Sequence, residues 1–528
     1  MPLDETTEGE DVEELGVSAA KGGGIFVSSK IITSVITAIL LIFLTRFLKP
    51  ADYGTYTIII AFSTILGMGG NFGIGTALRK KIPEFRYGSE RILEVINNGY
   101  FVALILALAI TAVGIAASGS IATYIYHNPG MTGPLIVASV TVLLTVLFNV
   151  TIAVLVGLNK IKEAAFSNII YGISQAAIVM LLVILGYGIF GAVLGIAISL
   201  AIGSIISIAY LERNIVYKVM KPKIDGIREL TAFSTPLIIS NISVVGTTSL
   251  AIAFLGIFAS ASLVGSYGAA FKLGRLVEVL LTSTTFVLLP AFASALKNEH
   301  LSKRIEGIFN NSIYYMLLLL LPLVAYLVSI AKPLTDVLFS SAYAGASLYF
   351  SIIIIGLTIG TIGSFAGTLI ISFGDTKKFM VYQGVTVIAE VVAMLVLIPY
   401  IKVFGALIAL FVAGPLILDV LYIKALSKQF SITQKWRSLA RITVPAIITF
   451  AVMFIISYAL HENIVTMAIN LAVLVLLYPP LIALSRGING RNIKFLKMVS
   501  KRFGRLESTL NALIRYTELF IKKDESLS

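Results

Sequence analysis

The sequence predicts an all-α polytopic membrane protein with about fourteen transmembrane helices. Of its 528 residues, 58% are hydrophobic and only 13% are charged, whereas a soluble domain carries about 25% charged residues. The mean hydropathy is +0.96. Apolar stretches recur along the whole chain, each long enough to cross a hydrocarbon core of about 30 Å as a helix. Composition and pattern together therefore exclude a soluble globular fold.

Fourteen apolar stretches of about 20 residues or more are bounded by charged or Pro/Gly clusters. An even number of spans places both termini on the same side of the membrane. The predicted spans are 24–46, 53–78, 92–118, 133–158, 161–186, 188–212, 230–257, 262–294, 306–331, 343–373, 378–400, 404–424, 441–460 and 463–485.

Basic residues lie almost entirely on one side of the predicted membrane. The loops after even-numbered spans and the C-terminal tail hold 32 Lys and Arg, whereas the loops after odd-numbered spans hold four. The positive-inside rule then places both termini in the cytoplasm of a multi-pass plasma-membrane protein. The formal net charge of +13 thus reflects orientation, and we expect no nucleic-acid partner. The loops on the opposite side are too short for a folded external domain.

The two ends of the chain differ in charge. The first fourteen residues hold seven acids, and residues 1–20 are expected to form an acidic cytoplasmic tail without a cleavable signal peptide. Residues 488–528 are basic and amphipathic, which predicts a helix on an anionic membrane surface. The alternative is a partner-binding helix. Its apolar positions are Leu496, Val499, Phe503, Leu506, Leu510, Leu513 and Phe520.

An internal repeat is visible at an offset of 211 residues. FLKPADYGTY at Phe47–Tyr56 precedes the body of span two, and FASASLVGSY at Phe258–Tyr267 holds the same place before span eight. Parallel repeats of this kind occur in transporters whose substrate site lies between the repeats. We therefore predict an N-lobe at 21–214 and a C-lobe at 215–428, each of six helices, with spans thirteen and fourteen (429–487) outside the repeat.

Enzymatic and metal chemistry find little support. The chain has no cysteine, which excludes thiolate metal sites. Its three histidines are scattered, which disfavours a histidine metal cluster. The glycine-rich stretch Gly67–Gly75 lacks the Lys-Ser/Thr of a nucleotide-binding loop and is better explained by close helix packing. We expect no cofactor and no ATP-binding domain, so transport energy would come from an H⁺ or Na⁺ gradient, the membrane potential or the substrate gradient.

Span 262–294 carries Lys272, Arg275 and Glu278 inside an apolar run. Spacings of three and three place them on one face of a helix. They lie about ten residues from the end of the span, roughly 15 Å deep at a rise of 1.5 Å per residue. Charges at that depth face a protein interior or an aqueous cavity. Two interpretations stay open: recognition of an anion, and a structural network with Glu278 and an acid from another helix.

Three further ionisable residues lie inside predicted spans. Lys30 is about six residues into span one, so it either reaches the interface or lines a cavity. Glu390 in span eleven and Asp419 in span twelve are candidates for proton or sodium coupling, because a buried carboxylate can change protonation state during a transport cycle. The alternative for both is pairing between helices.

The stretches TRFLKPADYGTYTIIIAFSTIL (Thr45–Leu66) and GNFGIGTALRKKIPEF (Gly70–Phe85) resemble the polysaccharide-transporter branch of the multidrug/oligosaccharidyl-lipid/polysaccharide (MOP) exporter superfamily. GSYGAAFKLGRLVEV (Gly265–Val279) resembles the matching stretch of the second lobe. This branch contains the O-antigen-type lipid-linked oligosaccharide flippases. The resemblance implies a MATE-like fold of two six-helix lobes plus two C-terminal helices, with a central cavity and alternating access.

The resemblance also implies a substrate and a site. We expect a non-enzymatic flippase that moves a polyprenyl-phosphate- or diphosphate-linked oligosaccharide from the inner to the outer leaflet for surface polysaccharide or glycoconjugate synthesis. Family members hold the negative charge of the sugar-lipid with cationic cavity residues, and the matching positions here are Lys272 and Arg275, with Lys30 as a weaker match. Membrane lipids and glycan-assembly enzymes are the other expected partners.

Two rival functions remain. A cation-coupled drug or metabolite antiporter of the same fold would favour an acidic or aromatic cavity, which the Lys and Arg excess disfavours. A membrane glycosyltransferase or ligase would need large extracytoplasmic loops with catalytic side chains, and those loops are short here.

Overall fold

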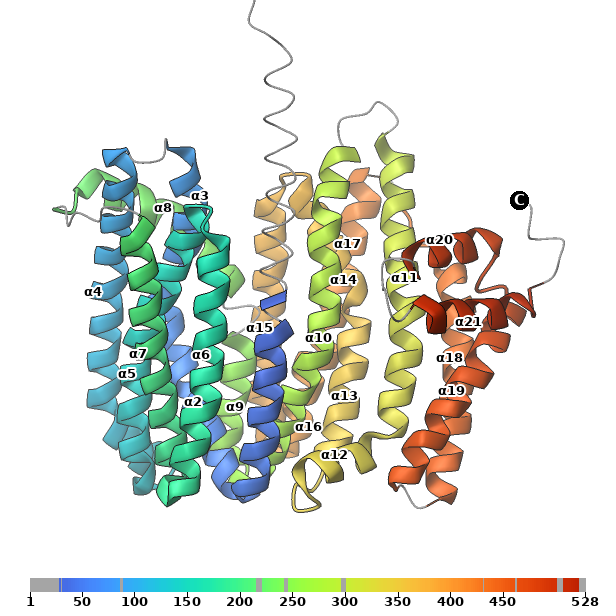
Figure 1. Cartoon of the computed structure of the whole chain (residues 1–528), viewed down its shortest axis with the longest axis horizontal. Helices are drawn as coiled ribbons and strands as arrows, with labels where there is room; N and C mark the ends of the chain where they lie inside the picture. Colours follow the sequence, from blue (N-terminus) through green and yellow to red (C-terminus); the bar gives the residue numbers. More distant parts are fainter. Residues whose placement is uncertain are drawn as a thin grey trace, which may run out of the picture. The chain divides into compact units, whose positions relative to one another are not determined.

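The structure is a computed structural model that describes residues 28–29, 31–85, 89–214, 221–241, 246–295, 301–430, 432–460, 463–500 and 507–521. Every regular element in these ranges is a helix (Figure 1). In their described parts, all fourteen predicted spans fall on helices, which confirms an all-α membrane protein. Within the described ranges, nine helical segments are long and apolar enough to cross a membrane, or ten if one bent pair counts as a span. One of the nine, Ile161–Arg213, holds two predicted spans joined by a turn at Gly186.

The first compact unit comprises residues 1–269 and 383–406. A hydrophobic core cluster lies mainly among α3, α4, α5 and α7, where Ile96, Val146 and Leu155 are almost fully buried. Besides the helix Ile31–Phe47 and most of α15 (Thr376–Ile401), its helices are α2 (Pro50–Asn71), α3 (Ile74–Lys81), α4 (Glu90–Ser120), α5 (Thr132–Gly157), α6 (Ile161–Leu182), α7 (Gly188–Asn214), α8 (Ile224–Asn241) and α9 (Thr247–Phe258).

The second compact unit comprises residues 270–382 and 407–528, so α10 (Ala261–Ala295) begins in the first unit and continues in the second. These units group residues by contact, and the two lobes inferred from the repeat stay a prediction. The other helices are α11 (Leu301–Ser329), α12 (Ala331–Phe339), α13 (Ala346–Ile359), α14 (Thr361–Ser372), α17 (Gly414–Phe430), α18 (Trp436–Ala459), α19 (Ile464–Leu484), α20 (Gly490–Ser500) and α21 (Glu507–Glu518). The short helix α16 (Val403–Ile408) begins in the first unit and ends in the second.

Several predicted spans are interrupted. Span 53–78 consists of α2 and α3, separated by Phe72 and Gly73, whose φ values are 35° and 73°. Span 343–373 consists of α13 and α14, which meet at Gly360. The short helix α12 was not predicted, because a helix of nine residues is too short to produce a membrane-length apolar run.

The repeat is visible as a nearly symmetric helix crossing in the first unit. A Cβ atom on Gly54 of α2 would lie 1.8 Å from the carbonyl oxygen of Ala261, and one on Gly265 of α10 would lie 2.0 Å from the carbonyl oxygen of Pro50. Pro50 and Ala261, like Gly54 and Gly265, are separated by the predicted offset of 211. Repeat-related glycines thus meet and let the two backbones touch, as small residues do at membrane helix interfaces.

A second pair of equivalent hydrogen bonds joins the residue just before one helix to a side chain on another helix. The residues of the two bonds are offset by 212 positions. In the first unit, the Asn98 side-chain oxygen accepts the backbone N–H of Lys223 at 3.0 Å. In the second unit, the Asn310 side-chain oxygen accepts the backbone N–H of Lys435, also at 3.0 Å. The start of α18 therefore packs on α11 as the start of α8 packs on α4. This contact lies at the entry to predicted span thirteen, and the prediction that spans thirteen and fourteen stand outside the repeat stays a prediction.

The C-terminal segment forms two helices in its described part, α20 and α21, rather than the single amphipathic helix predicted (Figure 1). Ile514 is buried, and the Tyr516 hydroxyl donates to the carbonyl oxygen of Leu476 at 3.0 Å. Lys497 and Glu518 join α20 to α21 by an ion pair of 2.5 Å. Helix α21 thus packs on α19 of the same chain through residues that were not in the predicted apolar stripe. Phe503 and Leu506 lie outside the described residues.

Candidate functional site

The predicted charged stripe lies on α10, in the part that belongs to the second unit. Nη1 of Arg275 donates to both carboxylate oxygens of Glu278, at 2.7 and 2.9 Å. The Arg275 side chain keeps 43% of its surface exposed, and that of Glu278 keeps 21%. The three-residue spacing that put both charges on one face of the helix therefore lets them pair directly.

Aromatic and small residues position the Arg275 side chain. The guanidinium lies 5.9 Å from the ring centre of Phe271, one turn earlier on α10. That ring in turn lies 6.3 Å from the ring of Phe411. A Cβ on Gly274 would come within 2.6 Å of Ile353 on α13, so only glycine allows this approach. Phe271 could have been found from its i−4 spacing to Arg275, whereas Phe411 has no such local signal.

Lys272 lies one turn before Arg275 on α10 and is partly buried. With two basic residues and one acid, the stripe has a formal charge of +1. A cation in a site with little water attracts an anion far more strongly than it does in bulk water. Recognition of an anion by Lys272 and Arg275 stays a prediction.

Asp419 lies in a tight seam between α14 and α17. Its side chain is 7% exposed, and a Cβ on Gly363 would lie 2.3 Å from its Oδ1 atom. Gly367, one turn along α14, faces Tyr422 in the same way. The two glycines are four residues apart, a spacing typical of close helix packing in membranes. Oδ1 of Asp419 has no hydrogen-bond partner among the described residues.

Glu390 lies on α15 in the first unit and is 8% exposed. The side chain of Thr247 on α9 hydrogen-bonds to it, while its Oε2 atom has no partner within the described part of the chain. Both predicted coupling acids are therefore buried carboxylates with an unsatisfied oxygen. Lys30, the third predicted cation, lies outside the described residues.

The described helices are those of a multi-pass membrane protein. Comparison with solved structures shows that its fold is that of the MOP superfamily. The chain matches a lipid II flippase, MurJ, in an inward closed conformation with a TM-score of 0.72 and 14% identity, covering 87% of this chain and 98% of that one. It matches an inward-facing multidrug resistance MATE transporter with a TM-score of 0.60 and 17% identity, covering 75% and 96%. At these identities the likeness establishes the fold.

Sequence comparison establishes the family. Residues 43–348, more than half of the chain, match the family model described as polysaccharide biosynthesis protein, and the chain belongs to that family. It is also 22% identical over 415 residues to the probable low-salt glycan biosynthesis flippase Agl15 of Haloferax volcanii, covering 78% of this chain and 84% of that protein.

Proposed function

We propose that this protein is a flippase that moves a lipid-linked oligosaccharide from the inner to the outer leaflet by alternating access. The proposal is carried by the cationic stripe in the middle of α10 in a chain of the polysaccharide biosynthesis family. The similarity to a glycan biosynthesis flippase and the fold shared with a lipid II flippase support the same conclusion.

The chemistry of the stripe suits a substrate with a phosphate or diphosphate linkage. In the proposed mechanism, Lys272 and Arg275 together hold the phosphate, and Arg275 begins in a pair with Glu278. A diphosphate brings enough charge to compete with Glu278 for the guanidinium, whose planar fork matches phosphate oxygens. The sugar then occupies aqueous space while the polyprenyl chain stays in lipid. Lys30 is a further candidate phosphate ligand.

Glu390 and Asp419 are the proposed coupling residues. Each is a buried carboxylate with one unsatisfied oxygen, and such groups mark proton or ion pathways in membrane proteins. Because the seam around Asp419 is closed by Gly363, a structural role is more strongly indicated for Asp419 than for Glu390. We therefore expect Glu390 to dominate any response to an H⁺ or Na⁺ gradient.

A reconstituted flipping assay tests the proposal. Proteoliposomes with a fluorescent polyprenyl-diphosphate oligosaccharide are compared for the wild type, Lys272→Ala, Lys272→Arg and the double variant Lys272→Ala/Arg275→Ala, with and without H⁺ and Na⁺ gradients. We expect Lys272→Ala to slow flipping by about tenfold or more, as loss of one charge-assisted hydrogen bond would, and Lys272→Arg to retain most of the rate. Wild-type rates in the double variant would refute the phosphate site.

The same preparation separates the rival functions. The buried acids and the MATE-like fold are what a cation-coupled antiporter of drugs or metabolites would also show, so export of cationic drugs without glycan flipping would favour that function. New glycosidic linkages in the recovered lipid-linked sugar would instead indicate a glycosyltransferase or ligase.

A further inference from the structure

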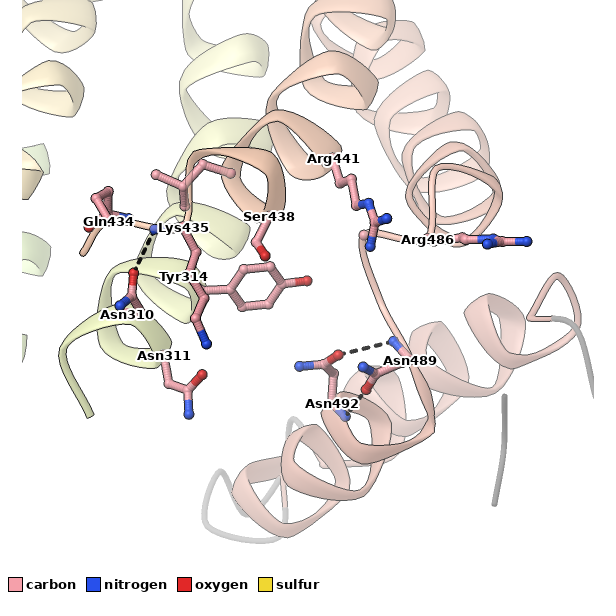
Figure 2. A pocket seen from close by; sticks show the side chains of 12 residues that line it. Asn310, Asn311, Tyr314, Gln434, Lys435, Ser438, Arg441, Arg486, Asn489 and Asn492 are labelled. Carbon is pink, nitrogen blue, oxygen red and sulfur yellow. Dashed lines mark hydrogen bonds between the residues drawn. The ribbon is translucent and has the colours of Figure 1, made fainter. Parts of the chain in front are cut away.

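A polar cavity of about 200 Å³ lies in the second unit, away from the charged stripe of α10. It is bounded by α11, the start of α18 and the connection from α19 to α20, and Figure 2 shows side chains from all three facing it. Lys435, Arg441 and Arg486 are among the lining residues, which include no acid. The volume far exceeds the 10–15 Å³ or so that one water requires. The cavity can therefore hold an anionic group with several waters.

The repeat supplies an internal comparison for this cavity. The equivalent place in the first unit, offset by 212 residues, is a space of only about 10 Å³. There Glu229 occupies the position equivalent to Arg441, and Gly226 the position equivalent to Ser438. Lys81 donates to Glu229 at 2.8 Å, which holds the pKa of the Glu229 carboxyl below its ordinary value.

A second acid, Glu94, pairs with basic side chains at the equivalent place in the first unit. Glu94 accepts a hydrogen bond from Nζ of Lys223 at 2.9 Å and pairs with Arg91 at 3.1 Å. The equivalent acid in the second unit, Glu306, instead accepts the hydroxyl of Thr433 at 2.6 Å and does not line the cavity. One copy of the repeat is thus closed by its own ion pairs, whereas the other keeps an open, cationic cavity.

Unsatisfied polar atoms in the same cavity also indicate a ligand. The Tyr314 hydroxyl and both side-chain polar atoms of Gln434 are buried without a hydrogen-bond partner among the described residues. Tyr314 and Gln434 both line the cavity, and Figure 2 shows the Tyr314 hydroxyl directed toward Ser438 and Arg441. Buried donors and acceptors are normally paired. These atoms are closed off from the cavity as the side chains stand, so a ligand in the cavity would bond to them after the side chains turn toward it.

We propose that this cavity binds a phosphate group, carried either by an anionic lipid headgroup or by free inorganic phosphate. Arg441 supplies a guanidinium fork and Lys435 a compact ammonium, which together match the oxygens of a phosphate. On the proposed topology the cavity opens at the cytoplasmic end of α18 and α19. The inference does not depend on flipping activity, because it concerns a separate group of residues.

Two binding measurements on the full chain distinguish the sources. Protein in phosphatidylcholine nanodiscs, with or without phosphatidic acid, is analysed by native mass spectrometry for retained lipid. Detergent-solubilised protein is titrated with inorganic phosphate by calorimetry. The variants are Arg441→Glu, which introduces the acid found at the equivalent position, and Lys435→Gln, which leaves the backbone N–H that Asn310 binds. Arg437→Glu, on an exposed residue of α18 outside the lining, is the matched control for net charge.

We expect Arg441→Glu to lower the binding of at least one probe by about tenfold, Lys435→Gln to lower it severalfold, and Arg437→Glu to leave it within about twofold. Loss confined to phosphatidic acid identifies a lipid site, and loss confined to inorganic phosphate identifies a soluble anion. If Arg441→Glu does not give a folded protein, Lys435→Gln decides alone. The proposal is overturned if neither probe binds the wild type, or if the control weakens binding as much as the cavity variants do.

Discussion

The crossing of α2 and α10 gives the sharpest test of how the repeat is packed. In Gly54→Ala, the new Cβ would lie 1.8 Å from the carbonyl oxygen of Ala261, and in Gly265→Ala it would lie 2.0 Å from that of Pro50. Real Cβ atoms essentially never come within 3.0 Å of such an atom, so the backbones must separate by about 1 Å. A closely packed helix interface cannot absorb that shift without losing contacts along its length.

Overpacking of this kind costs about 1–3 kcal/mol, and occasionally more. The better helix propensity of alanine offsets up to about 1 kcal/mol of that amount. We therefore expect a net destabilisation of about 1–2 kcal/mol for either variant, measured as a lower apparent melting temperature of the detergent-purified protein. Gly67→Ala is the matched control, because Gly67 lies on α2 and a Cβ added there would have nothing within 4 Å. Equal melting temperatures for Gly54→Ala and Gly67→Ala would refute the crossing.

Three further perturbations test other contacts. Gly363→Ala places a Cβ 2.3 Å from Oδ1 of Asp419, so it should destabilise the protein by about 1–3 kcal/mol. Adding Asp419→Ala should recover much of that loss. Strictly additive shifts in melting temperature would contradict this packing. Asn310→Ala removes the acceptor of a loop N–H and should cost about 1–3 kcal/mol; an unchanged melting temperature would count against this hydrogen bond. Lys81 lowers the pKa of Glu229, so their pairing stabilises the protein at neutral pH and is lost as acid protonates Glu229. The melting temperature of Glu229→Gln should therefore fall slightly less than that of the wild type from neutral to acidic pH. The difference in stability should stay within about 1 kcal/mol, because the pair is exposed. A steeper fall in the variant would contradict the pairing.

The helical framework was predictable because each membrane span must satisfy its own backbone hydrogen bonds and bury about 20 apolar residues. Those demands are local, so α10 was expected at 262–294 and is found at Ala261–Ala295. Interruptions were not predictable in the same way. Phe72 and Gly73 break span two by their positive φ values, yet neither residue lowers the hydropathy enough to mark an end.

The candidate site was predictable in part. The pairing of Arg275 with Glu278 follows from their spacing on one helix, and the structure forms it. The seam that buries Asp419 against Gly363 joins residues 56 positions apart, and no local pattern connects them. The functions proposed for Lys272, Glu390 and Lys30 stay predictions that the flipping assay must test.

The sequence by itself determined the class of protein, the number of predicted spans, the expected orientation and the 211-residue repeat, because hydropathy, charge bias and helical spacing act over short distances along the chain. Only the tertiary structure decided what the repeat does in space. It brought Gly54 against Gly265. It also gave two equivalent positions different surroundings, because Glu229 helps to close the space in one copy and Arg441 lines an open cavity in the other. The physical reason is that packing and charge neutralisation depend on neighbours from distant parts of the chain, which one-dimensional patterns do not contain.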